Sequence, residues 1–293
     1  MDGTLKKNLE GHVGVLARDI GERHLRRPQA LAAAARYIEE QFARLGYPVH
    51  RQVYEAEGVS CANLEVECSG LDRERGIVLI GAHYDTVEGS PGADDNASGV
   101  ATAIEMARLL RGSRRQGSVR CVAFVNEEPP FFYSDKMGSA VYARAARARG
   151  DALQFMLSLE MLGYFSSRPG SQRYPPLLRF FYPDRGNFVA FVSNLRSRSA
   201  LVRIHDAFRS QRAFPSERLA SPAIVPGVSW SDQLSFWRAG FPAVMVTDTA
   251  FYRNPHYHRP TDTPETLDFT SMACVTAGLA RTVIVLTTAS LLK

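Results

Sequence analysis

The chain has 293 residues, of which 45% are hydrophobic and 22% are charged, and its formal net charge is +5. This length and composition are typical of an ordinary globular protein with a sizeable core. The densest basic cluster, Arg144, Arg147 and Arg149, indicates a solvated helix face, so we do not expect nucleic-acid binding.

Cysteine spacing and the charges of the first residues indicate the cellular setting. The four cysteines, Cys61, Cys68, Cys121 and Cys274, lie far apart, and none forms a Cys-x-x-Cys pair. We therefore expect buried free thiols, not disulfides or thiolate metal sites. Charges run through residues 1–20, which predicts neither a signal peptide nor a membrane span there, and a cytoplasmic location unless a leader was removed.

Helical and strand-like patterns alternate along the chain. Residues 29–46 repeat apolar positions at helical spacing and stop at Gly46, a residue common just past a helix end. Strand-like alternation follows at 49–54 and 62–67, and the apolar run 76–81 is typical of a strand buried on both faces. Farther along, we predict helices at 98–112, 137–149, 196–210, 232–239 and 269–292, and strands at 118–125, 153–159 and 243–247.

This alternation predicts an α/β fold with a central, largely parallel sheet covered by helices on both faces. The Pro- and Gly-rich stretches 168–176 and 214–228 are interpreted as long loops, because the same alternation continues on either side of each. No repeat or linker divides the chain, so we expect a single three-layer domain over residues 1–293.

Ligand-type side chains follow the predicted central strands, and others open the helix at 98–112. They are His83 and Asp85, Asp94 and Asp95, Glu127 and Glu128, Glu160, and, after strand 243–247, Asp248, His256 and His258. Ligands of open α/β sheets bind beyond the carboxyl ends of the strands. Imidazole and carboxylate without thiolate suit a catalytic site for zinc, manganese or cobalt.

Local spacing indicates roles for two pairs of these residues. His83 and Asp85 are two residues apart on an extended segment, which lets the Asp85 carboxylate accept the second imidazole N–H and fix the tautomer. Of the adjacent Glu127 and Glu128, one can bind a metal while the other takes a proton from bound water.

The chain resembles the zinc aminopeptidases related to bacterial leucyl aminopeptidase, glutamate carboxypeptidase and glutaminyl cyclase. The matching segments are GAHYDTVEGSPGADDNASGV (81–100), VAFVNEEPPFF (122–132), LSLEMLGYF (157–165), SDQLSFWRAGFPAVMVTDT (231–249) and HYHRPTDTPETLD (256–268). The resemblance implies two zinc ions, with manganese or cobalt as substitutes. It implies the metal ligands His83, Asp94, Glu128, Glu160 and His258.

In this resemblance, Asp94 bridges the two metals, Glu127 is the general base, and the Asp94–Asp95 peptide is cis. His258 is preferred to His256 because the family pattern places the ligand three residues before Asp-Thr, here Asp262-Thr263. Two positions depart from the pattern: Glu160 stands where many relatives have Asp, and Gln233 where many have His.

We therefore expect a metal-dependent exopeptidase, specifically an aminopeptidase that hydrolyses N-terminal bonds of peptides or aminoacyl amides. The alternatives are glutaminyl cyclisation and a binding protein that has lost its metals, although no ligand is missing here. Tyr, Arg or backbone groups of loops 214–230 and 251–257 are candidate oxyanion donors. Candidate pocket-lining aromatics are Phe131, Phe132, Tyr133, Phe251, Tyr252 and Tyr257.

Overall fold

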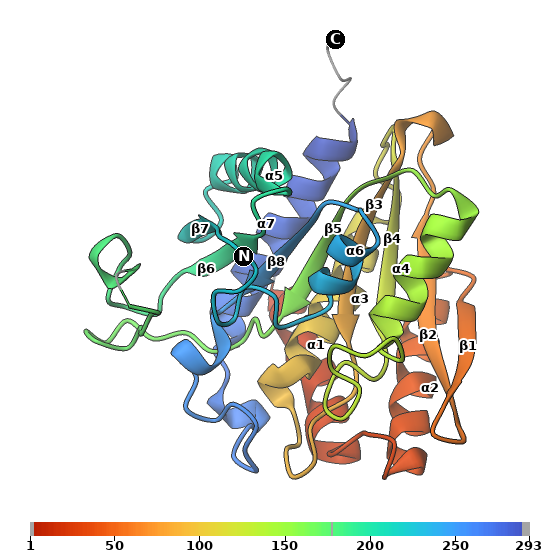
Figure 1. Cartoon of the computed structure of the whole chain (residues 1–293), viewed down its shortest axis with the longest axis horizontal. Coiled ribbons are helices and arrows are strands. Elements are labelled where there is room, and N and C mark those ends of the chain that lie inside the picture. Colours follow the sequence, from red (N-terminus) through yellow and green to blue (C-terminus); the bar gives the residue numbers. More distant parts are fainter. Residues whose placement is uncertain (1–2, 177, 289–293) are drawn as a thin grey trace.

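The computed structural model describes residues 3–176 and 178–288. Its strands are β1 (His50–Ala56), β2 (Val59–Cys68), β3 (Ile77–His83), β4 (Ser118–Phe124), β5 (Leu153–Glu160), β6 (Val189–Ser193), β7 (Ser216–Ala220) and β8 (Ala243–Thr247). They form one eight-stranded sheet in the order β1-β2-β4-β3-β5-β8-β6-β7 (Figure 1).

The sheet is mixed, with a parallel centre. Strands β4, β3, β5 and β8 run parallel to one another, whereas β2 is antiparallel to β4 and β6 is antiparallel to β8. The carboxyl ends of the four central strands therefore meet at one edge, which is where an open α/β sheet places its ligands.

In the described residues, seven α-helices surround the sheet: α1 (Gly3–Val13), α2 (Pro28–Arg44), α3 (Gly99–Leu110), α4 (Gly138–Arg149), α5 (Arg198–Ser210), α6 (Gln233–Arg238) and α7 (Phe269–Thr288). Short helical segments occupy Gly14–Ile20, Arg73–Arg75, Ala93–Ser98, Leu178–Phe180, Ala250–Tyr252 and Pro264–Thr266.

The two faces of the sheet are covered unequally. Helices α1, α2, α3, α5 and α7 pack on one face and enclose the main core. Helices α4 and α6, in front of the sheet in Figure 1, cover the other face with a smaller core that includes Phe124, Met156 and Phe236. On that second face, loops cover β6 and β7, and this arrangement leaves room for a pocket.

Helix α7 is long and apolar enough, by length and composition, to cross a membrane. It contacts α1, α3 and α5, and 56% of its most apolar window is buried inside the protein. The apolar residues that make α7 hydrophobic enough to cross a membrane therefore form part of the protein core.

The expected single α/β domain is confirmed, and the predicted central strands and helices match the observed ones to within one or two residues at most ends. The last predicted helix reaches Thr288, and residues 289–292 lie outside the described residues. The interpretation of 214–228 as loop is wrong at β7, a short edge strand of half-buried residues whose sequence, SERLA, lacks clear alternation.

The cysteines form no disulfide in the described chain. Cys61, Cys68 and Cys121 are buried free thiols as expected, whereas Cys274 on α7 is partly exposed.

Candidate active site

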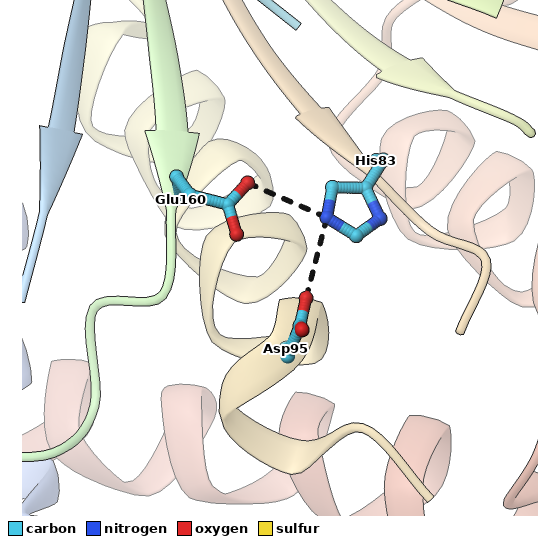
Figure 2. A group of neighbouring side chains, drawn as sticks. All are labelled: His83, Asp95 and Glu160. Carbon is cyan, nitrogen blue, oxygen red and sulfur yellow. Dashed lines mark ion pairs between the residues drawn. The ribbon is translucent and has the colours of Figure 1, made fainter. Parts of the chain in front are cut away.

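The candidate site lies at the carboxyl edge of the parallel strands. His83 is the last residue of β3, Glu160 is the last residue of β5, and Glu127 and Glu128 follow β4. Asp95 comes from the short helical segment before α3, and His258 from the loop after β8. Figure 2 shows His83, Asp95 and Glu160 converging from two strand ends and this segment.

Two groups of ligand-type atoms share the Asp95 carboxylate. In the first group, His83 Nε2 lies 3.4 Å from Asp95 Oδ1 and 3.4 Å from Glu160 Oε2 (Figure 2). In the second, His258 Nε2 lies 3.1 Å from Asp95 Oδ2 and 3.4 Å from Glu128 Oε1. The ligand atoms of each group lie within 4.8 Å of one another, so each group can surround one metal ion.

The state of individual atoms fits a divalent metal. His83 Nε2 and Glu128 Oε1 are buried, and neither has a hydrogen-bond partner among the described residues. A buried polar atom without a partner lowers the stability of the fold, and a bound cation would give both of these atoms a partner. Nitrogen and carboxylate donors without thiolate match a catalytic zinc site.

The expectation that Asp94 is the bridging ligand is wrong. Its Oδ1 accepts a hydrogen bond from the Gly163 amide at 2.8 Å and its Oδ2 from Asn254 Nδ2 at 2.6 Å, away from both histidines. Asp95 has an extended backbone (φ −105°, ψ 88°), so neighbouring side chains project to different sides. The cis peptide is likewise one residue later than expected, between Asp95 and Asn96.

Asp85 acts on the glutamate pair more directly than on His83. His83 Nδ1 donates to the backbone carbonyl of Asp85 at 3.2 Å, whereas the Asp85 carboxylate is 3.7 Å from that nitrogen. The carboxylate instead accepts from the amides of Glu127 and Glu128, both at 3.0 Å. The predicted tautomer control therefore comes from the carbonyl, and the carboxylate fixes the glutamate backbone.

A cavity adjoins the ligand groups on the loop-covered face of the sheet. Its empty volume is about 850 Å³, including space open to solvent, and Glu160, Trp230 and Tyr257 line both it and the smaller cavity over the ligands. Of the aromatics expected there, Phe251, Tyr252 and Tyr257 line the larger cavity and Phe132 the smaller one, whereas Phe131 is part of the core.

A model of the family described as Peptidase family M28 matches residues 63–283. The chain belongs to peptidase family M28. It is 39% identical over 282 residues to the uncharacterized protein YfbL of Escherichia coli K12, and this match covers 93% of this chain and 86% of YfbL. It is 28% identical over 210 residues to a probable leucine aminopeptidase of Arthroderma benhamiae, and this match covers 67% of the chain but only 50% of that relative.

Solved structures share the fold of this M28 peptidase. The zinc aminopeptidase BSAP of Bacillus subtilis superposes with a TM-score of 0.76 at 15% identity, over 98% of this chain and 96% of that one. A glutaminyl cyclase of Fimbriiglobus ruber gives 0.71 at 21% identity, over 96% and 95%. At these identities the solved structures show the shared fold alone, whereas family membership and the aminopeptidase relatives support a metallo-exopeptidase.

A buried arginine that sequence reasoning missed holds the Asp95 loop of this M28 peptidase. Arg23 is fully buried, and its guanidinium donates to the carbonyls of Pro91 at 2.6 Å and Gly92 at 2.8 Å, just before the loop. It also donates to Tyr84 O at 2.7 Å, next to His83. Nothing in the local sequence distinguishes Arg23 from the other arginines of the chain.

Asp262 holds the same loop from the C-terminal side. Its two carboxylate oxygens accept from the amides of Asp94 at 2.9 Å and Asp95 at 3.1 Å. Asp262 lies in the segment HYHRPTDTPETLD, and the sequence indicates for it only its spacing from His258. Arg23 and Asp262 together fix the backbone that presents the shared carboxylate.

The charges of the cluster depend on one another because the groups are buried together. Burial raises the pKa of Glu127 well above its usual range and that of Glu128 to about 7. Burial lowers the pKa of His258, but the nearby carboxylates of Asp95 and Glu128 outweigh it and raise the value to about 10. Without cations the cluster therefore retains protons, and metal binding would displace them.

Two remaining sequence candidates, His256 and Gln233, lie outside the two ligand groups. His256 Nδ1 is 2.9 Å from Thr261 Oγ1 and its ring packs edge-on against Tyr164. Gln233 is buried and donates to the carbonyl of Val228 at 3.1 Å. Glu160, which stands where many relatives have the shorter Asp, belongs to the first ligand group. Ser231 Oγ donates a hydrogen bond to Glu160 Oε2 at 2.6 Å.

Proposed function

We propose that this M28 peptidase is a two-metal aminopeptidase that binds zinc and hydrolyses N-terminal peptide bonds. The observation that carries the proposal is the Asp95 carboxylate, with one oxygen toward His83 and Glu160 and the other toward Glu128 and His258. His83, Asp95 and Glu160 would hold one ion, and Asp95, Glu128 and His258 the other.

Zinc bound there would polarise the scissile carbonyl and lower the pKa of a bound water to about 7. The general base is Glu127, whose Oε2 is 3.9 Å from His83 Nε2 and whose amide is fixed by Asp85. Glu127 takes the proton of the attacking water and then returns it to the leaving amine.

Among the candidate oxyanion donors, the structure favours Tyr257. Its ring lines both cavities, and none of the hydrogen bonds found among the described residues involves its hydroxyl. Burial raises the pKa of Tyr257 far above its usual value, so the hydroxyl stays protonated and can donate to the developing oxyanion.

The test combines metal analysis with a matched pair of variants. The purified protein is reconstituted with zinc, its metal content is measured, and aminoacyl anilides are assayed with and without chelator. We expect about two zinc ions per chain, activity that chelation abolishes, and a loss of at least about a thousandfold in Glu127→Gln without loss of metal. Glu74→Gln, which removes the same charge at an exposed position, should retain full activity.

The same assays separate the alternatives. Two bound metals with cyclisation of N-terminal glutamine, and no hydrolysis, would assign the site to glutaminyl cyclisation. A protein that binds no metal after reconstitution would contradict both enzymatic functions and favour the binding protein.

A further inference from the structure

One row of side chains crosses the floor of the large cavity from the ligand groups to the edge of the sheet. The strand register pairs Glu160 with Thr247, Thr247 with Ala190, and Ala190 with Glu217. Paired residues of neighbouring strands point to the same face of a sheet, and all four residues line the cavity. The row therefore begins at a proposed zinc ligand and ends at a second carboxylate.

The walls of this cavity are largely aromatic. They include Trp230 and Tyr257 near the ligands, Phe251 and Tyr252 along one side, and Tyr174 and Tyr182 near Glu217. The rings of Tyr174 and Tyr182 are stacked, with centroids 5.8 Å apart. Such walls suit an aliphatic stem, and aromatic faces also attract a cation.

The Glu217 carboxylate forms no hydrogen bond or ion pair with any residue that the structure describes. The nearby hydroxyls are engaged elsewhere, since Tyr174 donates to Pro183 O at 2.6 Å and Tyr182 to Arg218 O at 2.9 Å. Partial burial raises the pKa of Glu217, and this effect outweighs the lowering by the more distant charge of Arg209.

Arg173 and Arg218 also line the cavity, but neither forms an ion pair with Glu217. Arg218 is the next residue on β7, so its side chain lies on the opposite face, where it binds Asp206 at 2.8 Å. Arg209 belongs to α5, which covers that same opposite face, and its charge reaches Glu217 without forming an ion pair. Arg173 is exposed and donates to Phe251 O at 3.1 Å. The floor of the cavity is therefore anionic at its far end.

We propose that Glu217 makes this cavity a specificity pocket for lysine or arginine as the N-terminal residue of the substrate. The proposal rests on the proposed aminopeptidase function, which places the scissile bond beside Glu160. The stem of the side chain would lie along the aromatic walls above Thr247 and Ala190, and its charged end would pair with Glu217.

Length and charge both favour this class of substrate. Three interstrand spacings separate Glu160 from Glu217, roughly 14 Å between their backbones, so a short side chain would leave the far end empty. An uncharged long side chain would bury Glu217 without a partner, and an acidic one would meet a like charge. A lysine or arginine side chain supplies both the stem and the counter-charge.

The test compares a lysyl with a norleucyl substrate, because norleucine has the same four-carbon stem without the ammonium group. Anilides of both are assayed with the zinc-loaded wild type, Glu217→Gln and Glu74→Gln. We expect the wild type to favour lysyl anilide, and Glu217→Gln to lower this preference about tenfold to a hundredfold, the value of a charged hydrogen bond. Glu74→Gln should leave the ratio unchanged.

Binding gives a readout that does not depend on turnover. Affinities of lysinamide and norleucinamide are measured by calorimetry on zinc-loaded Glu127→Gln, alone and combined with Glu217→Gln. Preferential binding of lysinamide that vanishes with Glu217→Gln supports the pocket even where hydrolysis fails, so failure of the proposed function remains distinguishable. Equal affinities for the two amides, or a preference that survives Glu217→Gln, would overturn the proposal.

Discussion

The two halves of the sheet differ in what covers them. Around β3, β4 and β5, helices cover both faces, and an imidazole or carboxylate of the ligand groups stands at or shortly after the end of each strand. Around β6, β7 and β8, one face is covered by helix α5 while the other faces a cavity walled by aromatic loops. The first half is packed between helices on both faces, whereas the second borders a cavity on one face.

Under the proposed function, this difference separates the residues that would carry out hydrolysis from those that would select the substrate. The ligand half contributes His83, Glu128 and Glu160 from strand ends that cannot shift without disturbing the core. The cavity half meets it at Glu160, Trp230 and Tyr257, and its other residues would contact only the side chain of a substrate. Substitutions in the first half should therefore abolish turnover with every substrate, and substitutions in the second should change which substrates are cleaved.

The adjacent residues Asp95 and Asp94 provide the sharpest test of the ligand half. Asp95→Asn should remove metal from both groups and lower activity at least about ten-thousandfold, because the metals supply several kcal/mol to the transition state. Asp94→Asn should keep the metals and mainly lower stability, since Asp94 accepts from Gly163 and Asn254. Zinc content of the two variants decides, and metal loss in Asp94→Asn alone would refute the assignment.

Arg23 tests whether the ligand half depends on its buried support. Arg23→Met leaves the carbonyls of Tyr84, Pro91 and Gly92 without their donor and should destabilise the fold by about 3–5 kcal/mol in urea unfolding. Arg26→Met is the control: Arg26 is exposed and pairs with Glu88 at 2.6 Å, so its loss should cost less than about 1 kcal/mol. Equal costs would show that the buried guanidinium contributes no special support.

Tyr257 lies where the two halves meet. Tyr257→Phe keeps the ring in the cavity wall and removes only the hydroxyl, so kcat should fall about a hundredfold with little change in KM. The fall should be similar for lysyl and leucyl substrates, because the oxyanion is common to both. A change confined to KM would place the hydroxyl in substrate binding instead.

Ala190 tests the cavity half alone. Ala190→Leu would occupy part of the floor between Thr247 and Glu217. We expect kcat/KM for long side chains to fall about tenfold, the scale of a few methylene groups in a pocket, while an alanyl substrate is cleaved as before. Zinc content should not change, and a uniform loss over all substrates would contradict the separation of the two halves.

The sequence predicted the ligand half better than the cavity half, for a physical reason. His83, Glu128 and Glu160 stand at the ends of apolar runs that announce buried strands, so strand order alone brings them together. Asp94 and Asp95 are both carboxylates in one irregular loop, and only the backbone angles decide which faces the histidines. A pattern of residue types contains no record of those angles.

The cavity half depends on contacts between distant segments. Glu217 belongs to a short strand without hydrophobic alternation, and its proximity to Glu160 arises from pairing across β8 and β6. Arg23 likewise acts on carbonyls more than sixty residues away, through bonds to backbone that any residue would offer. Neither role has a local signature.

The hydrogen bonds of Asp262 to the Asp94 and Asp95 amides also determine how late in synthesis the two ligand groups can be completed. A nascent chain that has emerged as far as Glu160 already carries His83, Asp95 and Glu128, but it lacks His258. It also lacks Asp262, whose carboxylate holds the loop amides. The second ligand group therefore cannot form until synthesis has passed His258 and Asp262.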